Sequence, residues 1–148
     1  MKRAFCILLA ALLLCGCTAL LTGCGALKKA AQLQSYDFGP DSIPSVNSVV
    51  GERKVTGVES GTGSGGIYKE FAYESETVSD DLIAYLIDGL LAKGWYALVD
   101  FDLLEVPGTA QLATESADSG QIIIMDVSYE QEGYTIRLTK GEGTLSLN

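Results

Sequence analysis

Residues 80–93, Asp-Asp-Leu-Ile-Ala-Tyr-Leu-Ile-Asp-Gly-Leu-Leu-Ala-Lys, are the stretch that decides the fold of this chain. Six aliphatic residues recur in it at the spacing of helical turns: Leu82, Ile83, Leu86, Ile87, Leu90 and Leu91. This pattern predicts a helix whose broad apolar stripe must be buried against another element.

The residues around this stretch predict where the helix begins and ends. Thr77 or Ser79 can cap its N-terminus, and the two aspartates that follow complement the helix dipole. Lys93 gives a cationic last turn, and Gly94 suits a left-handed C-cap.

Alternating apolar and polar residues predict strands on both sides of the helix. The predicted strands are residues 67–75, 95–104, 109–115, 121–129 and 134–140. Short turns join the last four strands, which predicts an antiparallel meander covered by the helix. The predicted fold class is therefore α+β. A single helix packs on one face of a mainly antiparallel four- to five-stranded sheet, in the order β-α-β-β-β-β.

We expect the domain to begin at residue 67 and to extend to residue 148. Residues 24–66 predict a flexible tether, with a short edge strand near 48–59. Gly61-x-Gly63-x-x-Gly66 matches the dinucleotide fingerprint by letter, but a predicted strand follows it where that fingerprint requires a helix. We interpret these glycines as a flexible loop.

Residues 1–23 have the features of an export signal. Lys2 and Arg3 precede an apolar run from Ala4 to Leu21. The run ends in Leu21-Thr22-Gly23-Cys24, which resembles the lipobox of bacterial lipoproteins. This resemblance implies cleavage before Cys24, a diacylglyceryl group on its thiol, and often acylation of the new amino group. Two acyl chains suffice for stable anchoring.

Three alternatives to this interpretation stay open at the level of sequence. Cys17 also follows a glycine and would leave a shorter apolar run, although its own upstream cysteine fits the lipobox less well. The 18 residues from 4 to 21 are long enough for an uncleaved membrane helix. An ordinary secretory signal cut at another small residue is the third alternative.

The charge of the expected mature chain argues against nucleic acid as a partner. Eight basic and 19 acidic residues follow position 23, which gives a formal net charge of −11. Nucleic acid attracts basic surfaces, so we expect no nucleic-acid partner. The expected partners are the membrane, through the lipid anchor, and another protein of the envelope. The expected location is the cell membrane, facing outside the cytoplasm.

The residue types that the chain lacks bear on catalysis. There is no histidine, and all four cysteines lie at or before position 24. These absences remove disulfides and Cys-based metal sites from the exported part, together with Ser-His and Cys-His nucleophile pairs. We therefore expect no enzyme, no catalytic residues and no cofactor.

Two other groups of residues are candidates for binding. Asp100, Asp102 and Glu105 are weak candidates for a cation such as calcium, since calcium takes six to eight oxygen ligands. A straight strand would hold them poorly, so we expect a solvated sheet face instead. Tyrosine is enriched at interfaces, and three tyrosines that we expect to face outward could form a contact patch: Tyr68, Tyr85 and Tyr96. We favour the alternative that they are ordinary sheet tyrosines.

Most of the chain after position 23 resembles small uncharacterised lipoproteins of Gram-positive bacteria. The resemblance lies in residues 43–54, the aromatic strand at 67–75, the helix end Tyr-Leu…Lys-Gly-Trp at 85–95, and Gly-Tyr-Thr-Ile-Arg-Leu at 133–138. It is a likeness of hydrophobic spacing and implies no activity. We expect a non-enzymatic binding or assembly module of the cell envelope, or alternatively a receptor for a small ligand or cation.

Overall fold

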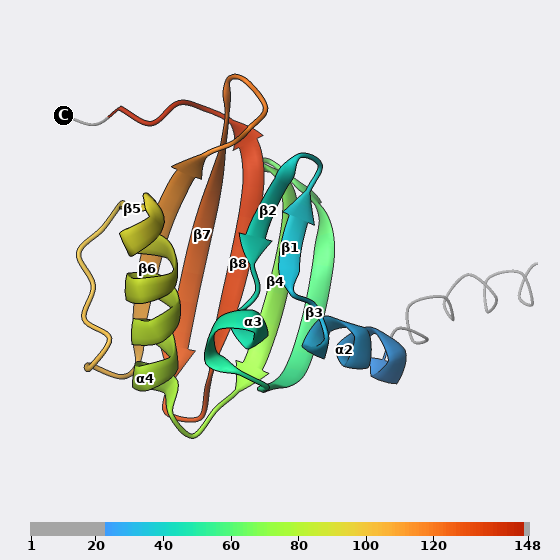
Figure 1. The fold of residues 1–148 in the computed structure, drawn as a ribbon, viewed down its shortest axis with the longest axis vertical. Coiled ribbons are helices and arrows are strands. Elements are labelled where there is room, and N and C mark those ends of the chain that lie inside the picture. The colour runs from blue at the N-terminus through green and yellow to red at the C-terminus, as the bar shows by residue number, and fades with distance from the viewer. Residues whose placement is uncertain (1–22, 147–148) are drawn as a thin grey trace, which may run out of the picture.

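The computed structural model describes residues 23–146, which fold around one six-stranded antiparallel sheet (Figure 1). Its strands are β3 (Lys54–Gly63), β4 (Gly66–Glu74), β5 (Tyr96–Ala97), β6 (Gly108–Glu115), β7 (Gln121–Glu130) and β8 (Gly133–Glu142). They lie in the order β3-β4-β8-β7-β6-β5. The α+β class and the antiparallel pairing are confirmed, while the sheet has more strands than the four to five that we expected.

The predicted helix runs over residues 78–93 and changes geometry along its length. It begins as α4 (Val78–Leu82), continues as the π-helix η1 (Ile83–Leu90) and closes as the 3₁₀ turn η2 (Leu91–Lys93). Gly94 ends it in the left-handed region, with φ 95°, as its position predicted. Figure 1 shows this helix in front of β6 and β7.

The apolar stripe of this helix differs in part from the predicted one. Leu82, Leu86 and Leu90 are fully buried, as expected, but Ile87 is 38% exposed and Tyr85 is buried in its place. In a π-helix the backbone bonds reach five residues back, which shifts the residues that share a face.

The strand predicted at residues 95–104 was wrong for most of its length. Only β5 pairs with β6, and the chain then leaves the sheet. The backbone N–H of Leu104 donates to Asp102 Oδ1 at 2.8 Å, and the hydroxyl of Tyr129 donates to the Asp102 carbonyl at 2.7 Å. These hydrogen bonds hold residues 102–104 in a turn, which is incompatible with the extended backbone of a strand.

Residues 24–66, which we expected to be a flexible tether, contribute five regular elements to the domain. They are α2 (Gly23–Ala31), β1 (Ser35–Phe38), β2 (Asp41–Pro44), α3 (Val46–Val50) and β3. The residues that they bury in the core are Ala30, Tyr36, Phe38, Ile43, Val46 and Val55. The expected flexible tether was wrong because one helix is too narrow to cover six strands, whereas the short edge strand expected near residues 48–59 overlaps β3, which lies at the edge of the sheet.

The β1–β2 hairpin covers the half of the sheet that the helix leaves open. It lies in front of β4 and β8 in Figure 1, and the ring of Tyr36 stacks on Phe71 with centroids 4.4 Å apart. The core is thus closed on one face of the sheet by two covers, the helix and this hairpin.

Candidate functional site

Cys24, the predicted lipid attachment residue, lies in the first turn of α2 and is exposed with a free thiol. Leu21 and Thr22 of the lipobox, and the alternative Cys17, lie outside the described residues. Within residues 23–146, no helix has the length and apolar character to cross a membrane.

Helix α2 is docked on the domain at its C-terminal end. Ala30 is buried and Leu27 packs against the core. The side-chain amide of Asn47 donates to the carbonyl of Ala31 at 3.0 Å and to that of Arg53 at 3.1 Å, and its oxygen accepts from the Arg53 N–H. Asn47 therefore fixes the end of α2 to the connection between α3 and β3.

The sheet edge far from α2 carries exposed apolar side chains. Four of them fall in the stretch from β5 to the following turn: Tyr96 at 39% exposed, Leu98 at 43%, Val99 at 46% and Leu104 at 75%. We call these four residues the distal apolar edge. The N–H of Leu98 donates to the Gln111 carbonyl at 2.9 Å, so the stretch is held beside β6.

The acidic residues of this stretch, which were weak candidates for a cation, are spread along a loop. Asp100, Asp102 and Glu105 lie in the loop after β5, and Asp102 serves the turn described above. Nowhere in the described part of the chain do three or more His, Cys, Asp or Glu residues converge as metal ligands do. Asp100 and Glu105 add two carboxylates to the same stretch of chain as the distal apolar edge.

The face of the sheet opposite the two covers is lined by paired polar side chains. Gln111 donates to Asp126 at 2.6 Å across β6 and β7. Arg137 on β8 bonds Glu70 on β4 at 3.1 Å, and its guanidinium lies 3.8 Å from the ring centroid of Tyr68. The carboxylates of Asp126 and Glu70 are therefore already hydrogen-bonded within the sheet.

Of the three tyrosines that we expected to face outward, one was misplaced. Tyr68 lies on the open sheet face and Tyr96 on the distal apolar edge, but Tyr85 is fully buried. Its hydroxyl donates to the Pro44 carbonyl at 2.8 Å, and burial raises the pKa of Tyr85 well above its usual value. The predicted tyrosine patch does not form.

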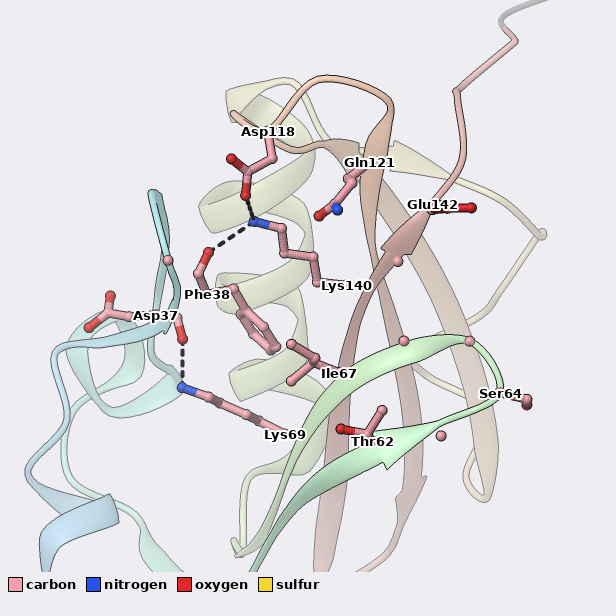
Figure 2. A pocket seen from close by; sticks show the side chains of 15 residues that line it. Asp37, Phe38, Thr62, Ser64, Ile67, Lys69, Asp118, Gln121, Lys140 and Glu142 are labelled. Atoms are coloured by element: carbon pink, nitrogen blue, oxygen red, sulfur yellow. Dashed lines mark hydrogen bonds and ion pairs between the residues drawn. The ribbon is translucent and has the colours of Figure 1, made fainter.

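A cleft of about 810 Å³ opens where three turns meet (Figure 2). The β1–β2 turn, the glycine-rich β3–β4 turn and the β6–β7 turn line it, together with the end of β8. Lys69 crosses one side, where its ammonium donates to the Asp37 carbonyl at 2.5 Å and lies 5.0 Å from the centroid of the Phe38 ring.

Lys140 closes the other side of this cleft and is almost fully buried. Its ammonium donates to the Phe38 carbonyl at 3.0 Å, to Asp41 Oδ2 at 2.7 Å and to Asp118 Oδ2 at 2.5 Å. The hydrogen bonds from Asp118 and Asp41 raise the pKa of Lys140. All three protons of the ammonium are in use, so Lys140 joins the β1–β2 hairpin to the β6–β7 turn and has no donor left for a ligand.

Sequence reasoning overlooked this lysine, although the sequence carried a signal for it. Strand alternation puts residues 134, 136, 138 and 140 on one face, and the first three are apolar. A lysine in the fourth inward position indicates a buried charge that needs acidic partners. Asn47 gave no such signal, because its partners are backbone atoms brought together by the fold.

Comparison with known proteins found no match for this chain. No protein-family model matches it, and neither a curated protein nor a solved structure does so.

Proposed function

We propose that this protein is a lipid-anchored, non-enzymatic binding or assembly module on the outer side of the cell membrane. Cys24 is the attachment residue, and the distal apolar edge is the surface that contacts another protein of the envelope. The lipobox resemblance supports the anchor, and the exposed apolar stretch at one end of the sheet supports the contact surface.

The distal apolar edge is the observation that carries the binding role. A chain with a formal net charge of −9 has ample polar residues for its surface, yet four large apolar side chains are exposed within residues 96–104. Clustered exposed apolar surface marks interaction sites more often than isolated exposed residues do. Because Asp100 and Glu105 lie in the same stretch, this surface suits a partner that presents apolar side chains flanked by lysine or arginine.

The anchor is tested by the intact mass of the protein extracted from membranes of its native cells. We expect a chain that begins at Cys24 and carries a diacylglyceryl group. Cys24→Ala should abolish the modification, whereas Cys17→Ala should leave it unchanged. A mature chain that retains an unmodified Met1 would refute the anchor.

The contact surface is tested by placing a photoreactive amino acid at Leu104 and, as a control, at the exposed Glu132. We expect a discrete crosslinked protein from position 104 and not from position 132. The same crosslink should weaken when Leu98→Asp is added. Equal crosslinking at both positions to abundant neighbours would refute the proposed contact surface.

The cleft of Figure 2 supports a second candidate function, the binding of a small ligand or cation. The ammonium of Lys69 and the exposed side chain of Ile67 both line the cleft, which therefore combines a cationic group with apolar surface. Calcium at millimolar concentration should shift the thermal unfolding midpoint if a cation is the ligand. An unchanged midpoint would reject the cation version of this candidate.

A further inference from the structure

We infer that helix α2 holds the domain in one orientation on an anionic lipid surface, with the β3 edge toward the bilayer and the distal apolar edge away from it. This inference rests on the proposed lipid attachment at Cys24. It adds a second contact, between the protein surface around α2 and the lipid headgroups.

The connection between the lipid attachment residue and the domain is short. The buried Ala30 follows Cys24 by six positions, and a helix rises about 1.5 Å per residue, so the lipid attachment residue is about 9 Å from the first core residue. A flexible tether of the expected 24–66 range would instead have an end-to-end distance of about 35 Å. The Asn47 bonds to Ala31 and Arg53 further restrict rotation about this short stem.

Charge is distributed unevenly along the chain. Residues 24–54 carry four basic and three acidic residues, a net charge of +1, whereas residues 55–148 carry four basic and 16 acidic residues, a net charge of −12. Lys28 and Lys29 on α2 are exposed, and neither takes part in an ion pair within residues 23–146. An anionic surface attracts the α2 end and repels the rest of the domain.

These charges act on the lipid headgroups only over a short range. At physiological salt the screening length is about 8 Å, so only charges close to the headgroups contribute. The two lysines follow the anchor by four and five residues and lie within this range. Attraction at the stem and repulsion of any acidic surface that approaches the bilayer then favour the same orientation.

The sheet order places the two ends of the domain at different heights. Helix α2 lies beside β3 in Figure 1, and β5 is at the opposite end of the order β3-β4-β8-β7-β6-β5. Five strand spacings of about 4.8 Å separate the two edges by about 24 Å. Trp95, the only tryptophan of the chain, immediately precedes β5 and should therefore lie far from the bilayer.

The test uses the chain 24–148, which contains every described core residue, since the first of them is Ala30. Its only cysteine, Cys24, is coupled chemically to a maleimide lipid in vesicles of phosphatidylcholine and phosphatidylglycerol that also contain a dansyl lipid. Energy transfer from Trp95 to the dansyl group is compared with transfer in the variant Trp95→Phe/Leu33→Trp. Leu33 is exposed and lies two residues after α2.

We expect transfer from position 33 to exceed transfer from position 95 severalfold. The double variant Lys28→Glu/Lys29→Glu should reduce this ratio, as should vesicles of phosphatidylcholine alone. Asn47→Ala should reduce it as well by freeing the stem, provided that its circular dichroism spectrum is unchanged.

A ratio on the anionic vesicles that neither the double variant nor phosphatidylcholine vesicles change would show that the anchor alone keeps position 33 near the bilayer and would overturn the inference, as would a ratio of one or less. Because the lipid is attached chemically, this outcome is independent of processing in cells. A failure of the cellular mass measurement would refute the proposed anchor without deciding the orientation, so the two failures are distinguishable.

Discussion

The guanidinium of Arg53 holds the carboxylate of Asp81 through two hydrogen bonds of 2.7 Å, one to each oxygen. Arg53 precedes β3 at the edge of the sheet, and Asp81 lies in α4, where it is only 3% exposed. Ser75 also donates to this carboxylate at 2.7 Å. The pair therefore ties the helical cover to the N-terminal half of the chain.

Breaking this pair should destabilise the fold strongly. Arg53→Gln leaves the buried carboxylate without its cation, and we expect the free energy of unfolding to fall by about 3 kcal/mol. Lys54→Gln is the matched control, because the Lys54–Glu74 pair is largely exposed and worth less than about 1 kcal/mol. Urea unfolding measures both, and equal losses would contradict the assigned role of Arg53.

The same carboxylate predicts a dependence of stability on pH. Burial by itself raises the pKa of Asp81, but the hydrogen bonds from Arg53 and Ser75 bring it below its usual value. The unfolded chain then binds more protons than the folded one, so the stabilisation is present above about pH 3.9 and is lost as the pH falls through the folded pKa. Asp81→Asn should unfold more easily than the unchanged protein at pH 7, and the difference should shrink below about pH 4. A difference that stays constant down to pH 2 would show that the charge of Asp81 does not stabilise the fold.

The helix offers two neighbouring aliphatic residues with opposite environments. Leu86→Ala opens a cavity under the helix, because Leu86 is fully buried, and should cost about 2–5 kcal/mol. Ile87→Ala removes a side chain that is 38% exposed and should cost less than about 1 kcal/mol. Chemical denaturation of both variants tests the π-helical register, since a regular α-helix with the predicted stripe would make both substitutions costly.

In the β3–β4 turn the structure requires a glycine at position 66 but not at position 63. Gly66 has φ +124°, and a Cβ there would overlap the carbonyl oxygen of Lys140. We expect Gly66→Ala to cost about 2 kcal/mol or more and to lower the thermal midpoint. Nothing lies within 4 Å of a Cβ at Gly63, so Gly63→Ala should change the midpoint little. Equal tolerance at both positions would support the flexible loop that the sequence suggested.

The distribution of correct and wrong predictions follows the range of the interactions involved. Residues 80–93, 121–129 and 134–140 were assigned correctly because each has an apolar period that must face a core. The β1–β2 hairpin was not predicted because its strands have only four residues each, too few to show an apolar period. Its apolar residues are buried only because they pack against residues far along the chain, as Tyr36 does on Phe71. Residues 98–104 alternate as a strand does, yet Tyr129 draws the carbonyl of Asp102 out of the ladder.

The sequence by itself determined the helix, its end at Gly94, the antiparallel strands of the C-terminal half and the resemblance that makes Cys24 the expected lipid attachment residue. Periodicity and short motifs encode these features within a few turns of chain. Only the tertiary structure decided that residues 35–63 belong to the domain, that α2 is fixed by Asn47, and that Lys140 is enclosed by Asp41 and Asp118. Each of those features depends on atoms far apart in the chain that meet only when the apolar face of a six-stranded sheet is covered.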